Sequence, residues 1–339
     1  MDETALPIFT TVPARAALAG NPSDGYGGAV FAVPVSAYGA AVRLDSIDRG
    51  YELIDIHSGL SQFANWADLE HVLPSVTADV PHCLLLGVIA EVAGRHGPLA
   101  PFRLTADTTI PISVGLGGSS AIVIAALRVL IGRAGDALDP NELAVIALAI
   151  EVQRLGIAAG LQDRVVQAYN QPMLMQFDPE STQPGPGVFT PVRAAGDMRL
   201  FVASRTATSA PSQIVHGDLR ARFDSRDCTV NDAMPVLAGH AVDAAAAFAA
   251  ADVVRLGAAM DATFDKRVSI LDLARGHVEM IEAARSAGCH ANFTGSGGSV
   301  VVLAESAGVE AAARQSRNKL DCMIVSVETA APDAERGAG

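Results

Sequence analysis

Apolar residues recur along the chain in short runs that glycine and polar turns interrupt, and this pattern predicts both strands and helices. In the first half, period-two or short apolar runs predict strands over residues 7–19, 29–37, 40–44, 51–56, 102–109 and 174–177. Helical spacing predicts helices over residues 66–73, 80–96, 121–131, 141–155 and 161–169. Tyr38 and Gly39 separate two of the strands, so we expect a hairpin there.

The second half repeats this mixture of elements. Strands are expected over residues 198–204, 290–293, 299–303 and 322–327, and helices over residues 232–251, 269–287 and 309–317. Residues 178–187 are rich in Pro, Gly, Ser and Thr and are interpreted as a linker. The sequence therefore predicts an α+β protein with two domains, residues 1–185 and 186–330, and a disordered tail over 331–339.

A glycine-rich loop precedes the most apolar helix of the first half. Its glycines let backbone N–H groups approach a bulky anion, and its serines suit the first helical turn, where unpaired N–H groups favour a phosphate. The expected phosphate-binding residues are Pro111, Gly115, Leu116, Gly117, Gly118, Ser119, Ser120 and Ala121. The loop has no lysine and is not a Walker A motif, and a serine at its sixth position distinguishes it from a dinucleotide fingerprint. A strand-to-helix turn without a ligand is the alternative.

Charge and hydropathy narrow the possible partners. The net charge of −13 disfavours nucleic acid, which requires a basic surface. Mean hydropathy is +0.30, but no apolar run reaches the ~20 residues of a membrane span. The acidic N-terminus does not resemble a signal peptide, so we expect a cytoplasmic protein. Lys266 and Lys319 are the only lysines, so any catalytic cation in the first half is an arginine or a metal ion.

Two acidic residues acquire a chemical interpretation beside this loop. Taken alone, Glu151 has a solvated surface residue as the alternative to a chemical role. For Asp163 taken alone, the alternative is an ordinary aspartate at a helix start. Phosphoryl transfer from ATP, however, requires a phosphate cradle, a hard cation and an oriented acceptor hydroxyl. Ser120 and Glu151 are adequate ligands for Mg²⁺, and Asp163 can orient or deprotonate the hydroxyl. Arg15 can offset charge beside that aspartate.

Three glycine motifs, at residues 13–28, 115–121 and 293–298, together resemble the GHMP kinase superfamily. Within it, the chain is similar to glucuronokinases in residues 20–26, in the phosphate loop and in residues 155–165. The resemblance implies an N-terminal ATP-binding α/β domain and a C-terminal ferredoxin-like α/β domain. It also implies ATP and Mg²⁺ as cofactors, Ser120 and Glu151 as metal ligands, and Asp163 and Arg15 as catalytic residues.

The same resemblance implies contacts with a sugar substrate. The expected substrate-binding residues are Asn21, Asp24, Tyr26, Arg164, Gly295, Ser296 and Gly297. A uronate carboxylate needs a charged donor, and Arg164 is the first candidate, followed by Arg220 and Arg222. A structural ion pair is the alternative for Arg164.

The sequence thus predicts a kinase that phosphorylates the anomeric hydroxyl of a free sugar. A uronic acid such as glucuronate is the favoured acceptor. Alternative acceptors are a heptose phosphate, fucose or a galactose-like sugar. An alternative of a different class is an inactive kinase-like protein that only binds a ligand. Expected partners are ATP and the sugar, with no nucleic acid and no membrane, and the oligomeric state stays open.

Overall fold

A computed structural model describes residues 8–178, 187–205, 219–318 and 321–329. The chain divides into two compact units. The first unit comprises Met1–Ala14, Tyr38–Ile110 and Gly117–Asn170, and the second comprises Arg15–Ala37, Pro111–Leu116 and Gln171–Gly339. The units are therefore interleaved, whereas the sequence analysis places one boundary after residue 185. The reason is that strands β1 (Ile8–Ala19) and β2 (Ala29–Ser46) each contribute residues to both units.

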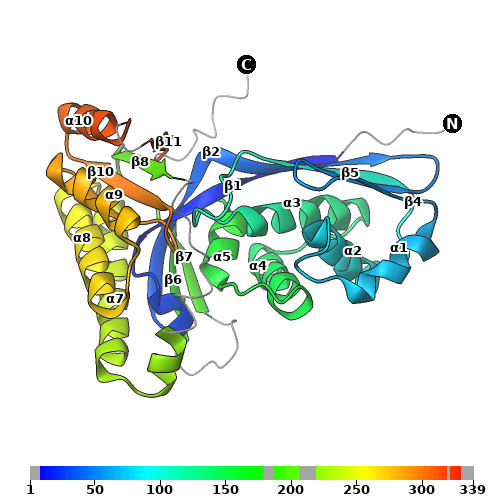
Figure 1. Ribbon diagram of the computed structural model, residues 1–339, viewed down its shortest axis with the longest axis horizontal. Helices are drawn as coiled ribbons and strands as arrows, with labels where there is room; N and C mark the ends of the chain where they lie inside the picture. Colours follow the sequence, from blue (N-terminus) through cyan, green and yellow to red (C-terminus); the bar gives the residue numbers. More distant parts are fainter. Residues whose placement is uncertain (1–7, 179–186, 206–218, 319–320, 330–339) are drawn as a thin grey trace. The chain divides into compact units, whose positions relative to one another are not determined.

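The first unit is a sheet covered by helices. Its strand order is β4-β3-β5-β2, and its strands are β3 (Tyr51–Asp55), β4 (Gly59–Phe63), β5 (Phe102–Thr108) and the second half of β2. Strand β1 also pairs with β2. Its helices are α1 (Trp66–Val72), α2 (Cys83–His96), α3 (Gly118–Arg133), α4 (Pro140–Ala149) and α5 (Leu161–Tyr169). Burial alternates along β5, as expected for a sheet with one covered face. Figure 1 shows α2, α3 and α4 on one side of this sheet.

The second unit holds a four-stranded antiparallel sheet with the order β11-β8-β10-β9. Its strands are β8 (Arg199–Ser204), β9 (His290–Phe293), β10 (Ser299–Ala304) and β11 (Met323–Val327). The helices are α7 (Cys228–Ala249), α8 (Val253–Ile270), α9 (Arg275–Ser286) and α10 (Ala307–Asn318), and apolar residues of α8, α9 and α10 pack with the sheet in one core. The first half of β2 pairs with β6 (Met173–Phe177), which pairs with β7 (Gly187–Pro191). The predicted α+β class is confirmed.

Several local predictions were wrong. No hairpin forms at Tyr38 and Gly39, because β2 continues through them. A Cβ on Gly39 would lie 3.2 Å from the carbonyl oxygen of Val12, so the glycine allows a close backbone approach and not a turn. Strands β4 and β7 and most of helix α8 were not predicted. The α8 N-terminus is nevertheless capped by Asp252, whose side chain accepts the backbone N–H of Arg255.

The described residues contain no helix long and apolar enough to cross a membrane. The predicted disordered tail and most of the predicted linker lie outside the described residues, and the cytoplasmic location stays a prediction.

Candidate active site

The phosphate loop enters helix α3 through a left-handed glycine. Gly117 has φ 73° and precedes the first helical residue, Gly118, so the N–H groups of the first turn have no partner within the helix. Ser120 is buried in this turn, and its hydroxyl donates to the Gly117 carbonyl oxygen at 3.1 Å. Helix α3 itself is buried over most of its length, as the sequence predicted, and therefore holds the loop in place. The arrangement suits a bound anion.

Gln167, on helix α5, fixes the same loop and was missed by the sequence analysis. Its side-chain amide donates to the carbonyl oxygens of Gly117, at 2.7 Å, and Pro13, at 3.1 Å. The residue is fully buried. A buried glutamine with two backbone partners acts as a brace for the loop. The available signal was a polar residue among the apolar positions of a short helix.

Glu151 lies in a π-helical turn, Ile150–Arg154, that follows α4. Such turns replace the regular hydrogen-bond ladder and often accompany functional sites. The Glu151 side chain has no exposed surface. Its Oε2 accepts from Nε of Arg164 at 3.0 Å and from Nη2 of the same residue, whereas Oε1 is buried without a hydrogen-bond partner among the described residues.

This pair corrects the expectation for Arg164. The guanidinium is 2% exposed and binds Glu151, and its Nη1 donates to the Gly160 carbonyl oxygen at 2.7 Å. The alternative of a structural ion pair therefore describes Arg164, and its guanidinium is committed to groups of the protein itself. The same guanidinium also lies near Asp163, with 3.8 Å between Nη1 of Arg164 and Oδ2 of Asp163.

Asp163 occupies the first turn of α5, as predicted. Its side chain is 22% exposed, which is much more than the neighbouring Arg164. The carboxyl group of Asp163 is thus accessible, as a group that orients or deprotonates an acceptor hydroxyl must be.

A pocket of about 450 Å³ opens in the first unit beside the start of α3. It is lined by the turn between β3 and β4, by the segment before α2 and by Ile122. Asp55 organises it: Oδ1 accepts the backbone N–H groups of His57 (2.8 Å) and Ser58 (2.6 Å), and Oδ2 lies 2.6 Å from Nδ1 of His82. Burial alone would raise the pKa of Asp55. The hydrogen bonds from these N–H groups and the charge of His82 lower it by more, so the pKa of Asp55 lies below its ordinary value.

In the second unit, Arg15 ties two glycine motifs together. Its Nη1 donates to the carbonyl oxygens of Gly115, at 3.1 Å, and Thr294. Its backbone N–H donates to Leu116 at 3.1 Å. A Cβ on Gly295 would lie 2.7 Å from the Gly115 carbonyl oxygen, so this contact requires glycine. Arg15 thus positions the loops, and its predicted effect on Asp163 stays a prediction.

The other residues expected to bind sugar belong to the first and third glycine motifs. Asn21 is buried, and its side-chain amide donates to the Phe293 carbonyl oxygen at 3.4 Å. Asp24 and Tyr26 belong to a short 3₁₀ turn, Ser23–Tyr26. Burial raises the pKa of Tyr26 to about 12, which Arg220 partly opposes. Gly297, next to Ser296, has φ 132°. The predicted contact of these residues with a sugar stays a prediction.

The two further arginine candidates have partners of their own. Arg220 pairs with Asp224 and lies over the ring of Tyr26, with 5.6 Å between the guanidinium carbon and the ring centroid. Arg222 pairs with Asp227 at 2.9 Å and donates to the Ile270 carbonyl oxygen. Both charges are matched within the protein, which disfavours them as the donor for a substrate carboxylate.

Known proteins are similar to this chain over most of its length. Residues 84–171 match the GHMP kinases N terminal domain. The chain is 31% identical to Glucuronokinase 1 of Arabidopsis thaliana over 86% of this chain and 83% of the relative, and 32% identical to Probable glucuronokinase 2 of the same plant over 86% and 82%. This chain belongs to the GHMP kinase superfamily. It is accordingly a phosphotransferase with an alcohol group as acceptor.

Solved structures show the same fold in other GHMP kinases. Methanococcus jannaschii mevalonate kinase superposes with a TM-score of 0.78 at 15% identity, covering 96% of this chain and 99% of that one. Lactococcus lactis galactokinase, solved with galactose, gives a TM-score of 0.77 at 16% identity, covering 97% and 95%. The predicted GHMP kinase fold is therefore confirmed.

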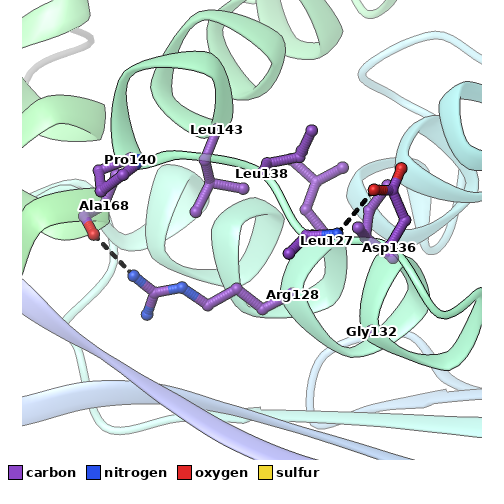
Figure 2. A pocket seen from close by; sticks show the side chains of 10 residues that line it. Leu127, Arg128, Gly132, Asp136, Leu138, Pro140, Leu143 and Ala168 are labelled. Carbon is purple, nitrogen blue, oxygen red and sulfur yellow. Dashed lines mark hydrogen bonds between the residues drawn. The ribbon is translucent and has the colours of Figure 1, made fainter.

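A second pocket of this GHMP kinase lies away from the phosphate loop. Its volume is about 300 Å³, and residues from the second half of α3, including Leu127 and Arg128, line it with Leu143 (Figure 2). Arg128 donates to the Ala168 carbonyl oxygen at 2.8 Å, at the C-terminal end of α5. Because this guanidinium caps a helix, and because the pocket lies at the opposite end of α3 from Gly118, we assign it no part in nucleotide binding.

Proposed function

We propose that this GHMP kinase transfers the γ-phosphoryl group of ATP to the anomeric hydroxyl of a free sugar, with a uronic acid such as glucuronate as the acceptor. The observation that carries the proposal is the similarity to two proteins named as glucuronokinases across most of the chain. The glycine loop before α3, the buried Glu151 and the accessible Asp163 support it, because these features suit an anion site, a metal ligand and a group that acts on the acceptor.

The start of α3 and the pocket organised by Asp55, both in the first unit, accommodate parts of ATP. The phosphates lie against the N–H groups at the start of α3, and the base enters the pocket organised by Asp55. Ile122 supports this arrangement, because it lines that pocket and stands in the second turn of the same helix. The pocket volume of about 450 Å³ lies in the range of small-molecule sites.

The residues present also fit a magnesium ion. Oε1 of Glu151 is a buried carboxylate oxygen without a hydrogen-bond partner among the described residues, and such an oxygen costs free energy unless a cation or donor meets it. Ser120 offers a hydroxyl oxygen, and two protein ligands suffice for an ion that keeps several waters. When bound, Mg²⁺ neutralises charge on the phosphate oxygens.

Asp163 acts on the acceptor. Its accessible carboxylate orients the sugar hydroxyl and accepts its proton, while the hydroxyl oxygen bonds to the γ-phosphorus and the bond from that phosphorus to the bridging oxygen breaks, which releases ADP. The Arg164–Glu151 pair supports this step indirectly, since it holds the start of α5 against the π-helical turn. Arg15 contributes by fixing the loops of the second unit.

The test is a screen of free sugars with ATP. Glucuronate, galacturonate, glucose, galactose, fucose and a heptose phosphate are compared by ADP release, and phosphorus NMR locates the new phosphate. We expect a uronate to give the highest kcat/KM and an anomeric phosphate. ADP release with neutral hexoses that equals the release with uronates contradicts the proposed substrate, and a phosphate at another carbon contradicts the proposed chemistry. Asp163→Asn serves as the inactive control.

A further inference from the structure

Helix α8 carries a buried arginine whose charge no carboxylate of the described chain meets by a hydrogen bond. Arg267 is 3% exposed. Its Nη2 donates to the Gly295 carbonyl oxygen at 2.9 Å, and its guanidinium carbon lies 5.1 Å from the centroid of the Phe293 ring. Its Nε and Nη1 are buried without hydrogen-bond partners among the described residues. Native proteins rarely leave two charged donors in this condition.

The charges of Asp24 and Arg15 act on Arg267. Burial lowers the pKa of Arg267 to about 10, Asp24 opposes this shift, and Arg15 adds to it. Arg267 is therefore still protonated at neutral pH. Two buried guanidinium groups thus contact the third glycine loop, Arg15 at Thr294 and Arg267 at Gly295. Asp24 is the carboxylate whose charge acts on Arg267, but it makes no hydrogen bond to the Nε or Nη1 of this guanidinium.

Other arginines of the second unit show how the protein treats a structural charge. Arg285, for example, donates to Asp261 at 3.1 Å and to Asp265 at 2.7 Å, although it is half-buried and lies over an aromatic ring much as Arg267 does. Arg222 is likewise matched by Asp227. Arg267 is more deeply buried than either and has less to compensate it. A purely structural role would favour the opposite arrangement.

The position of Arg267 on α8 relates it to the residues expected to bind sugar. One turn earlier on α8, the hydroxyl of Thr263 accepts the backbone N–H of Gly20 at 3.3 Å. Asn21, the next residue of that stretch, donates to Phe293, on whose ring Arg267 lies. The same face of α8 therefore contacts both the first glycine-rich stretch and the third glycine loop, which hold the residues expected to bind sugar.

We propose that the unpaired N–H groups of Arg267 bind the carboxylate of a uronic acid acceptor and thereby select uronates over neutral hexoses. The inference rests on the proposed sugar-kinase function and adds its specificity determinant. Because the guanidinium is shielded from solvent, a uronate reaches it through a local shift of the covering side chains. The carboxylate is then held away from water, where a charged hydrogen bond is strongest.

The experiment compares the parent enzyme with Arg267→Met, Arg267→Lys and the matched control Arg285→Met. For each variant, kcat/KM is measured with glucuronate and with glucose at saturating ATP, after far-UV circular dichroism and a thermal melt have verified folding. We expect Arg267→Met to lower kcat/KM for glucuronate by roughly 10- to 100-fold, the effect of losing a hydrogen bond to a charged group. Glucose should change only a few-fold, so the ratio between the two sugars collapses. Arg267→Lys should recover part of the ratio, and Arg285→Met should keep all of it.

The ratio separates the two possible failures. Equal losses for both sugars in Arg267→Met and Arg267→Lys would show that Arg267 only supports the Gly295 loop, which overturns the inference and leaves the kinase function intact. A parent enzyme that uses both sugars equally overturns the uronate substrate and, with it, the role of Arg267. Should Arg267→Met fail to fold, Arg267→Lys decides, because an unchanged ratio in that variant refutes the need for a guanidinium at this place.

Discussion

Removing the guanidinium of Arg164 should destabilise the first unit far more than removing a surface arginine. In the native protein, Arg164 and Glu151 are 2% and 0% exposed. The change Arg164→Met leaves a carboxylate buried with no positive partner, and its Oε1 already lacks a hydrogen bond among the described residues. Breaking such a pair from one side costs about 3–5 kcal/mol in free energy of unfolding. For a unit of this size, the midpoint of thermal unfolding should fall by on the order of 10 °C.

The chain supplies its own probe and control for this measurement. Trp66 is the only tryptophan and lies in the first unit, so its fluorescence reports unfolding of that unit in urea. The control is Arg95→Met, because Arg95 pairs with Glu91 at 2.9 Å on the exposed face of α2, with side chains 41% and 26% exposed. A pair of this kind contributes only about 0.3–0.5 kcal/mol.

A double variant tests whether the uncompensated buried charge of Glu151 causes the loss of stability. Replacing both partners, as in Glu151→Leu with Arg164→Met, removes the uncompensated charge and should restore most of the stability, although not the activity. If Arg164→Met costs less than about 1 kcal/mol, or if the double variant is no more stable than the single one, the buried pair does not hold the π-helical turn as described.

Three further results follow from the described contacts. Asp163→Asn should lower kcat by at least ~10²–10⁴-fold with little change in ATP affinity measured by calorimetry, and a loss of only a few-fold would reduce Asp163 to a helix-start residue. Ser120→Ala should raise the Mg²⁺ concentration needed for half-maximal rate, and an unchanged magnesium titration would assign the ion to other ligands. The net pKa of Asp55 is lowered in the folded protein, so its contribution to stability is present above the pKa of the unfolded chain and is lost as pH falls through the folded value. Asp55→Asn should therefore flatten the acid side of the stability curve followed by Trp66 fluorescence, and a curve that stays parallel to that of the parent argues against the contacts of Asp55.

The sequence predicted best where structure depends on neighbours along the chain. The glycine-rich loop and the buried helix behind it are specified by glycines, serines and apolar residues at adjacent positions. Prediction was wrong at Gly39, because a glycine that permits a close approach to Val12 carries the same local signal as one that makes a turn. Helix α8 was missed for a related reason, since helices are stabilised mainly by tertiary packing, here that of Phe264 in the core of the second unit.

The arginines show why the candidate site could be predicted only in part. Arg164 was favoured as the carboxylate donor because it adjoins Asp163 in sequence, but consecutive residues of a helix do not face the same way. Its guanidinium turns to Glu151, thirteen residues earlier, and is neutralised there. Arg267 does not adjoin a residue of the predicted site in sequence. It lies in helix α8, most of which the pattern of apolar residues did not predict. Its importance arises only after folding, when burial removes it from water and leaves two donors unmatched. Residue type indicates which side chains can bind a carboxylate, whereas the balance of charges in the folded protein determines which of them is still available to a substrate.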